Sequence, residues 1–224
     1  MLGVPDTWVV IPLFNEAAVI GDVVKHVVDT FPGVVCVDDG STDGSGDLAR
    51  SAGAVVVRHP VNLGQGAALQ TGICYALRDQ QMQYVVTFDG DGQHGADDAA
   101  LMVERLRRDE ADIVFGSRFL DSRTQSGWAK RALLRAAVAY TNLTTHVRLT
   151  DAHNGLRAFN RKAAETLDIR QNRMAHASEI VAQVGQARLR WAEQPVHIRY
   201  TDYSRAKGQS KLNAVNIVVE LLFK

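Results

Sequence analysis

Two carboxylates separated by one glycine, Asp89 and Asp91, offer the clearest chemistry in this sequence. They follow the apolar run 84–88, which has the length and composition of a buried strand, so we expect both side chains where that strand enters a loop. Carboxylate, carbonyl and amide oxygens suit a hard cation such as Mg²⁺ or Mn²⁺, which usually keeps waters and binds a substrate diphosphate. A polar turn is the alternative, because Asp-Gly pairs are common in turns. On spacing alone the turn is favoured, so the neighbouring motifs must decide.

Two other polar segments also follow apolar runs that read as strands. Residues 12–16 end the run 8–13, and residues 38–41 end the run 34–37. Ligands of open α/β sheets bind beyond the carboxyl ends of the strands. Three unrelated turns would each need a separate explanation, whereas one shared ligand site explains all three segments.

Strands and helices alternate along the first half of the chain. The apolar patterns and the Gly and Pro breaks predict strands at 8–13, 34–37, 54–58, 84–88 and 112–116, and helices at 17–30, 41–51, 66–79 and 96–108. Asn15 or a residue beside it is expected to cap the first helix. This alternation predicts an α/β fold with a mainly parallel central sheet and helices on both faces. No repeat or low-complexity linker divides the 224 residues, so we expect a single domain.

The net charge of zero conceals two halves of opposite sign. Residues 1–100 hold 13 Asp and Glu against 4 Lys and Arg, and residues 101–224 hold 12 against 21. The first half is therefore suited to a metal ion and the second to phosphate or an anionic surface. No aromatic-interleaved or zinc-finger pattern supports nucleic acid as the partner.

The compartment is inferred from cysteines and from apolar segments. Cys36 and Cys74 lie in apolar runs without CxxC spacing, which predicts core thiols in a reducing compartment. The first residues lack the basic and apolar regions of a signal peptide, and no apolar run reaches the roughly 18–20 residues of a membrane span. Residues 212–223 form an apolar helical stretch that could pack on the core, lie on a membrane or contact a membrane partner.

Two loops carry features that could recognise a nucleotide. Asp39 could accept a hydrogen bond from a base N–H, while Asp38, Ser41 or Asp43 could cap the following helix. Residues 62–66 place two glycines before a helix, where bare backbone can approach a nucleotide or diphosphate. This is not GxGxxG, and no aspartate ends the third strand, so NAD binding is disfavoured.

Seven motifs occur in a fixed order along almost the whole chain. They are Val-Val-Ile-Pro-Leu-Phe-Asn-Glu (9–16), Val-Asp-Asp-Gly-Ser-Thr-Asp (37–43), Asn-Leu-Gly-Gln-Gly (62–66), Asp-Gly-Asp-Gly-Gln-His (89–94), Gly-Ser-Arg (116–118), Leu-Thr-Asp-Ala-His-Asn-Gly-Leu-Arg (149–157) and Gly-Gln-Ser-Lys (208–211). The set resembles family 2 glycosyltransferases of the Rossmann-like GT-A fold. More narrowly, it is similar to the polyprenyl-phosphate group that includes dolichol-phosphate mannose synthase.

The resemblance implies a nucleotide-diphosphate sugar held by the first four motifs together with Mg²⁺ or Mn²⁺. Residues 1–115 would form the nucleotide-sugar and metal half, 116–211 the acceptor half, and 212–224 a C-terminal apolar helix. The residues implied for the nucleotide sugar are Pro12, Phe14, Glu16, Asp39, Gly64, Gly66 and Asp89, and those for the metal are Asp89, Asp91 and Gln93. Phe14 stands where tyrosine is frequent and Gln65 where lysine is frequent, which leaves the donor open.

The basic half then receives an acceptor role. The resemblance suggests that the lipid phosphate or the donor diphosphate is bound by Arg118, Arg131, Arg205 and Lys211. Arg131 and Arg135 lie on one helical face, and a solvated face is the default explanation for Arg135. The partners implied are a polyprenyl phosphate and either a membrane surface or a small membrane subunit, with the protein peripheral at the cytoplasmic face.

The acceptor determines the expected chemistry. A phosphate monoester is already anionic, so its oxygen can attack the anomeric carbon without a strong base, which predicts inversion. We expect catalytic roles for Asp91, Arg118 and Asp151, while Glu179 either orients hydroxyl groups or pairs with an arginine. Two alternatives stay open: a family 2 transferase acting on a sugar hydroxyl in polysaccharide assembly, and a non-catalytic sugar-nucleotide-binding subunit.

Overall fold

The computed structural model describes residues 5–120 and 147–199. The elements in chain order are β1 (Thr7–Leu13), α1 (Ile20–Val28), β2 (Gly33–Asp38), α2 (Ser45–Ser51), β3 (Val55–Arg58), α3 (Gln65–Ala76), β4 (Tyr84–Thr87), α4 (Ala96–Arg107), β5 (Ile113–Ser117), β6 (Arg157–Asn160), α6 (Arg161–Thr166), α7 (His176–Gln186) and β7 (Trp191–Pro195). Among these residues, no helix is long and apolar enough to cross a membrane.

One sheet with the strand order β3-β2-β1-β4-β6-β5-β7 forms the centre of the protein. Every neighbouring pair is parallel except β4–β6 and β5–β6, because β6 runs against the others. The order reverses between β1 and β4, since β2 and β3 extend to one side and the later strands to the other. Such a switch point leaves a crevice at the carboxyl ends of the strands, where open α/β sheets bind ligands.

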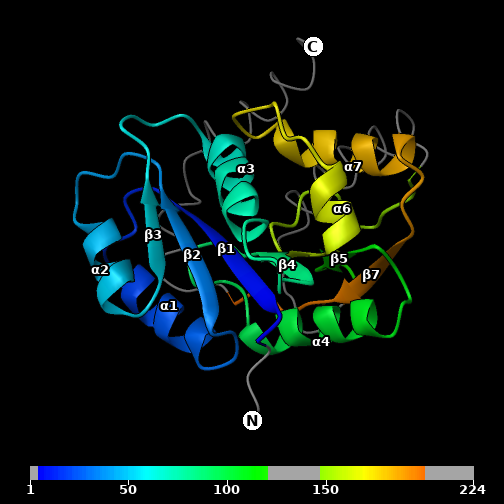
Figure 1. Ribbon diagram of the computed structural model, residues 1–224, viewed down its shortest axis with the longest axis horizontal. Coiled ribbons are helices and arrows are strands. Elements are labelled where there is room, and N and C mark those ends of the chain that lie inside the picture. Colours follow the sequence, from blue (N-terminus) through cyan, green and yellow to red (C-terminus); the bar gives the residue numbers. More distant parts are fainter. Residues whose placement is uncertain (1–4, 121–146, 200–224) are drawn as a thin grey trace.

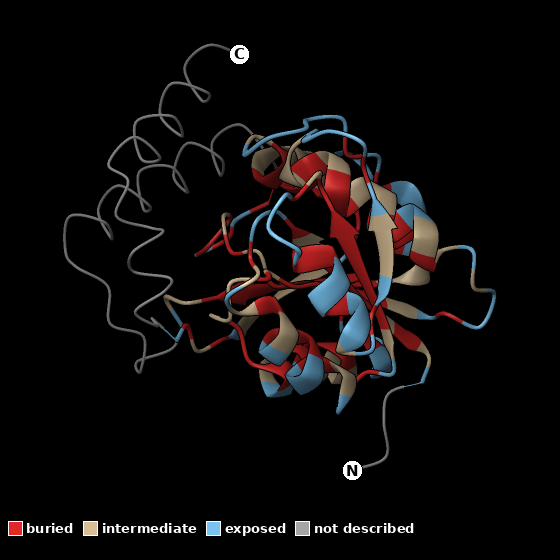
Figure 2. Ribbon diagram, turned by 90° about the vertical axis from the view of Figure 1, so that its left-hand side faces the viewer, coloured by how far each residue is buried: buried red, intermediate tan, exposed pale blue. Residues whose placement is uncertain are grey.

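Helices cover both faces of the sheet, as the alternation predicts (Figure 1). Helices α1, α2 and α4 cover one face, and α3, α6 and α7 cover the other. Alternate residues of β1 serve the two layers: Val9 and Ile11 pack with α1 and α4, whereas Val10 packs with α3. Figure 2 shows the buried strands between helices whose outer surfaces are largely exposed.

The amphipathic pattern of the helices explains their placement. In α1 the buried residues are Ile20, Val23, Val24 and Val27, which is the spacing of one helical face. Helix α1 begins at Ile20 rather than at 17, and its N-cap residue Val19 makes no side-chain cap. The predicted cap by Asn15 is therefore wrong, because Asn15 Oδ1 accepts from the Thr42 backbone N–H in the adjoining loop at 3.0 Å.

The two cysteines differ in burial. Cys36 is a buried core thiol on β2, and burial raises its pKa to about 12. Cys74 is exposed on α3, so the prediction of a second core thiol is wrong. The surrounding sequence is apolar, but position 74 falls on the solvent side of the helix, where Gln70 lies 3.3 Å from its sulfur.

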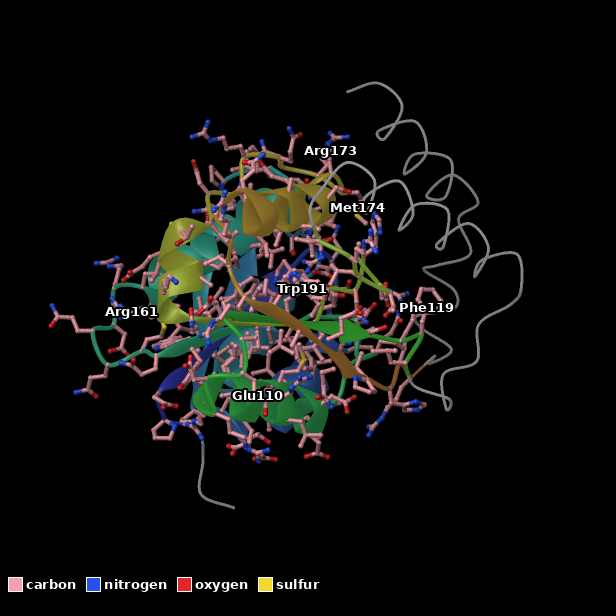
Figure 3. All side chains as sticks on the ribbon, turned by 90° about the vertical axis from the view of Figure 1, so that its right-hand side faces the viewer. Glu110, Phe119, Arg161, Arg173, Met174 and Trp191 are labelled. Atoms are coloured by element: carbon pink, nitrogen blue, oxygen red, sulfur yellow. The ribbon has the colours of Figure 1, made fainter. Side chains whose placement is uncertain are left out.

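The strand directions determine which loops meet. Because β6 runs antiparallel to β5, Arg161 after β6 and Phe119 after β5 lie toward opposite sides of the molecule (Figure 3). Arg173 and Met174 lie toward the same side as Phe119. The stretch 212–224 lies outside the described residues, and the division at 115 and 211 remains a prediction.

Candidate active site

The loops after β1, β2 and β4 enclose a cavity of about 370 Å³ at the switch point of the sheet. The lining residues are Pro12, Leu13, Phe14, Glu16, Asp39, Asn62, Gly64, Gln65, Ala68, Asp89, Gly90 and Asp91. Most positions expected to bind a nucleotide sugar are among them. Gly66, expected to bind the nucleotide sugar, and Gln93, expected to bind the metal, are not among them.

Hydrogen bonds between the first two loops hold one wall of this cavity. The backbone N–H of Asn15 donates to Ser41 Oγ at 3.0 Å, and that of Glu16 donates to Ser45 Oγ at 2.8 Å. Asp43 accepts from the backbone N–H groups of Ala17 and Ser45, both at 3.0 Å. The polar residues of the second loop therefore satisfy backbone donors that precede α1, which explains why this helix starts late.

Asp39 joins the second loop to the glycine-containing loop. Its Oδ1 accepts from His59 Nδ1 at 2.7 Å and from the Leu63 backbone N–H at 2.9 Å, and its Oδ2 accepts from the Gly64 backbone N–H at 2.7 Å. The side chain is 4% exposed. Asp39 is thus part of the cavity lining and also fixes the position of the loop at residues 62–64.

The two glycines of that loop face protein backbone. A Cβ atom on Gly64 would overlap the carbonyl oxygen of Asn172, and one on Gly66 would overlap that of Gln171. The Gly66 backbone N–H also donates to Asn172 O at 2.8 Å. At Gly66 the segment before α7 therefore occupies the space that was expected to admit a diphosphate. Gly64 still lines the cavity.

Glu179 accepts hydrogen bonds from the backbone of this segment. Its Oε2 accepts from the backbone N–H groups of Arg170 at 3.0 Å and of Gln171 at 2.9 Å. Within the part of the chain that the structure describes, Glu179 contacts an arginine through the Arg170 backbone, whereas the Arg170 guanidinium binds Asp168. Glu179 therefore positions backbone that contacts Gly64 and Gly66.

Asp89 is held from three sides. Gln65 Nε2 donates to its Oδ1 at 3.0 Å, and His94 Nε2 contacts its Oδ2 at 3.1 Å. A Cβ atom on Gly155 would come within 2.5 Å of its carboxyl carbon. Although burial opposes it, the hydrogen bond and charge of His94, and then the charge of Arg157, hold the pKa of Asp89 below its usual range.

Asp91 lies at the end of the cavity with Gln93 against it. The backbone N–H of Gln93 donates to Oδ1 at 3.0 Å, and its amide nitrogen donates to Oδ2 at 2.8 Å. Burial and then the charge of Asp89 raise the pKa of Asp91. Gln93 thus orients the carboxylate, and the negative charges of Asp89 and Asp91 oppose each other.

The chemistry of the lining fits a divalent cation bound with a diphosphate. Four lining side chains are carboxylates (Glu16, Asp39, Asp89 and Asp91), and none of the lining residues in the described part of the chain is Lys or Arg. The described residues contain no group of three or more His, Cys, Asp or Glu side chains that could enclose a metal. A site with two carboxylates suits an ion that takes its other ligands from water and phosphate.

The structure brings Arg118 and Asp151 together. Arg118 Nε lies 2.6 Å from Asp151 Oδ2, which also accepts from the Arg118 backbone N–H at 3.1 Å. Glu193 of β7 holds the adjoining turn, because its Oε1 accepts from the Thr150 backbone N–H at 2.8 Å. The two residues therefore form one ion pair next to the C-terminal end of β5, in which Asp151 is buried and Arg118 is partly buried. Arg131, Arg135, Arg205 and Lys211 lie outside the described residues.

Sequence reasoning missed Arg157, the largest fully buried side chain. It lies on β6, and burial lowers its pKa to about 10, although the charges of Asp89 and Asp151 act in the other direction. Its Nε and Nη1 have no hydrogen-bond partner among residues 5–120 and 147–199, and Nη2 lies 3.5 Å from Ala152 O. The motif at 149–157 contained this arginine, but nothing in the local sequence indicated a buried strand that inserts beside β4.

A family model described as "Glycosyl transferase family 2" matches residues 8–168, which include all the lining residues of the cavity. The chain belongs to this family. A UDP-N-acetylglucosamine–dolichyl-phosphate N-acetylglucosaminyltransferase of Methanococcus voltae is 27% identical over 96% of this chain and 94% of its own length. A polyprenol monophosphomannose synthase of Mycolicibacterium smegmatis is 29% identical over 97% and 84%.

A solved structure supports the fold. Glucosyl-3-phosphoglycerate synthase from Mycobacterium tuberculosis, in complex with Mn²⁺, UDP-glucose and phosphoglyceric acid, matches with a TM-score of 0.66. The identity is 18%, and the match covers 91% of this chain and 75% of the other. The predicted GT-A fold and the prediction of a glycosyltransferase are thus confirmed.

Proposed function

We propose that this glycosyltransferase moves a hexosyl group from a nucleotide-diphosphate sugar, either GDP-mannose or a UDP-hexose, to a polyprenyl phosphate. The observation that carries the proposal is the single cavity that runs from Pro12 and Asp39 to Asp89 and Asp91. The four carboxylates that line this cavity suit a sugar nucleotide that enters with a divalent cation. Relatives named for dolichyl-phosphate and polyprenol substrates, similar over nearly the whole chain, support the acceptor.

In this reaction the residues that line the cavity would have different roles. Asp39 would contact the base, and Phe14, 43% exposed at the cavity rim, would cover the nucleoside with its ring. Asp89 and Asp91 would hold Mg²⁺ or Mn²⁺, which supplies charge neutralisation of the leaving diphosphate. The acceptor phosphate is an anion at neutral pH, so its oxygen can attack without transferring a proton to the protein. In-line attack would invert the anomeric configuration.

The Arg118–Asp151 pair is the described part of the proposed acceptor site. Asp151 orients the Arg118 guanidinium through Nε, and a guanidinium is a group suited to phosphate oxygens. Arg131, Arg205 and Lys211 are proposed to complete the phosphate contacts. A membrane surface or a small membrane subunit would present the lipid, with the protein peripheral at the cytoplasmic face.

The test is transfer of label from GDP- and UDP-hexoses to polyprenyl phosphate in the presence of Mg²⁺ or Mn²⁺. We expect label in a butanol extract only when lipid phosphate and divalent cation are both present, and loss of label with EDTA. Asp91→Ala should reduce the rate at least about 100-fold, since it removes a preorganised charge. Asp47→Ala, an exposed acid on α2, is the matched control and should keep the wild-type rate.

The two alternatives give different results in the same assay. Label that enters a sugar acceptor but never the lipid would favour a transferase of polysaccharide assembly. Binding of sugar nucleotides without transfer to either acceptor would favour a non-catalytic subunit. Full rates in EDTA, or with Asp91→Ala, would overturn the metal assignment.

A further inference from the structure

The carboxylate of Asp39 has most of its hydrogen-bonding capacity occupied by the protein. Its Oδ1 accepts two hydrogen bonds, from His59 Nδ1 and the Leu63 N–H, and its Oδ2 accepts one, from the Gly64 N–H. An ionised carboxylate offers about four lone-pair positions, two on each oxygen. Counting the partners that the described residues supply, Oδ1 is therefore saturated, and a single position on Oδ2 remains for a ligand.

The contact from His59 is fixed by a second hydrogen bond. Thr71 Oγ1 lies 3.0 Å from His59 Nε2, on the side of the ring away from Asp39. Because a carboxylate only accepts, Nδ1 of His59 carries the proton of this hydrogen bond, and Nε2 forms a second hydrogen bond with the Thr71 hydroxyl. The imidazole is buried, so water does not compete for either contact. His59 is thus a positioning residue that keeps one lone pair of Oδ1 permanently occupied.

We propose that Asp39, with one free acceptor position, selects a base that offers one N–H flanked by carbonyl groups, so that the donor is a uridine diphosphate sugar. This inference rests on the proposed function, in which Asp39 faces the base. Guanine presents two adjacent donors, N1–H and the N2 amino group, which bind a carboxylate through both oxygens. Here the second donor would find Oδ1 already occupied and would remain unpaired in a buried site.

The other bases are excluded by a different mismatch. Adenine and cytosine each place an unprotonated ring nitrogen beside the amino group, so a lone pair would face the carboxylate. Uracil alone of the four RNA bases matches a single acceptor with a single donor. An unpaired buried donor weakens binding by about tenfold, or about 1.4 kcal/mol.

The first experiment needs no variant. Titration calorimetry of the full chain with UDP, GDP and N3-methyl-UDP, each with Mn²⁺, measures whether the single N–H is read. UDP should bind at least about tenfold more tightly than both other ligands. GDP equal to or tighter than UDP, or N3-methyl-UDP equal to UDP, would overturn the proposal.

Two variants of His59 distinguish selection of the base from a general structural role of His59 beside the loop at residues 62–64. His59→Leu removes the donor and opens a lone pair on Oδ1, so the preference for UDP over GDP should fall below about threefold even though both ligands bind less well. His59→Asn places an amide N–H near the position of Nδ1 and should retain the preference. An exposed histidine on α1, His26, gives the control His26→Phe, which should keep the wild-type ratio. An unchanged ratio in a folded His59→Leu variant would contradict the role of His59.

The outcome is distinguishable from failure of the proposed function. Transfer from a GDP-sugar to polyprenyl phosphate, with no transfer from UDP-sugars, would overturn the base selection and leave the reaction intact. Selective binding of UDP without transfer to the lipid would do the opposite.

Discussion

Replacing Gly155 with alanine tests whether the position of Asp89 determines donor binding. The added Cβ would lie within 2.5 Å of the Asp89 carboxyl carbon and closer still to both carboxylate oxygens. Ordinary contacts need more than about 3 Å, so the carboxylate must move by roughly 1 Å. A displacement of about 1 Å that misaligns reacting groups can lower the rate about 100-fold. The movement would also weaken the contacts from Gln65 and His94, and crowding of this kind costs about 1–3 kcal/mol of stability.

We therefore expect Gly155→Ala to lower kcat/KM for lipid transfer at least about 100-fold and to lower Tm by several degrees. Gly21→Ala is the matched control, because nothing lies within 4 Å of a Cβ at that position of α1. Alanine in a helix is favoured over glycine, so this control should keep its activity and gain slightly in Tm. In a variant that already lacks the carboxylate, Asp89→Gly, the addition of Gly155→Ala should cost no further Tm, since the clash disappears with the carboxylate. Wild-type kcat/KM and Tm in Gly155→Ala would refute the reasoning.

Three further predictions concern stability. Gly66→Ala forces a Cβ into the Gln171 carbonyl and should cost at least about 2 kcal/mol in urea denaturation, and an unchanged midpoint would contradict the packing described. Hydrogen bonds from Arg190 and Asn160 outweigh burial and lower the pKa of Asp112 to about 2, so this carboxylate stabilises the fold above pH 4 and loses that effect as the pH falls toward 2. Asp112→Asn should then cost about 1–2 kcal/mol at pH 7, discounted because Arg190 is half-exposed, with the difference from wild type disappearing near pH 2. Burial and then the charge of Arg157 lower the pKa of His176 to about 4. Between pH 6.5 and 4 a proton therefore binds this histidine in the unfolded chain but not in the folded protein, which favours unfolding. A His176→Gln variant should thus lose less stability than wild type over this pH range.

The sequence was most informative where a local pattern determines the structure. The strands and helices up to residue 117 were predicted within about four residues, because period-two and helical patterns alternate there without interruption. Their order also predicted that polar segments after β1, β2 and β4 would share one site. Asp39, Asp89 and Asp91 do line one cavity, although their roles toward a ligand remain predictions.

Contacts between distant segments could not be predicted in this way. The backbone at residues 171–172 packs against Gly64 and Gly66, and β6 inserts antiparallel between β4 and β5. A glycine before a helix reads as an opening for ligand, but whether ligand or protein backbone fills it depends on a segment about 100 residues away. The same limit applies to Asp89, because its environment depends on Gly155 and Arg157, which reach it only through β6.

The distribution of charge connects the sequence to the cavity. The acidic first half supplies all four carboxylates of the lining, and Gln65 donates a neutral hydrogen bond to Asp89. A diphosphate entering this lining would be repelled unless positive charge accompanied it, because none of the lining residues within 5–120 and 147–199 is basic. The proposed divalent cation would therefore do more than polarise the leaving group, because it would make entry of the donor electrostatically favourable. On this proposal the two halves of the chain have separate tasks: a bound ion would neutralise the charge of the donor, and arginine and lysine side chains of the basic half would neutralise the charge of the acceptor.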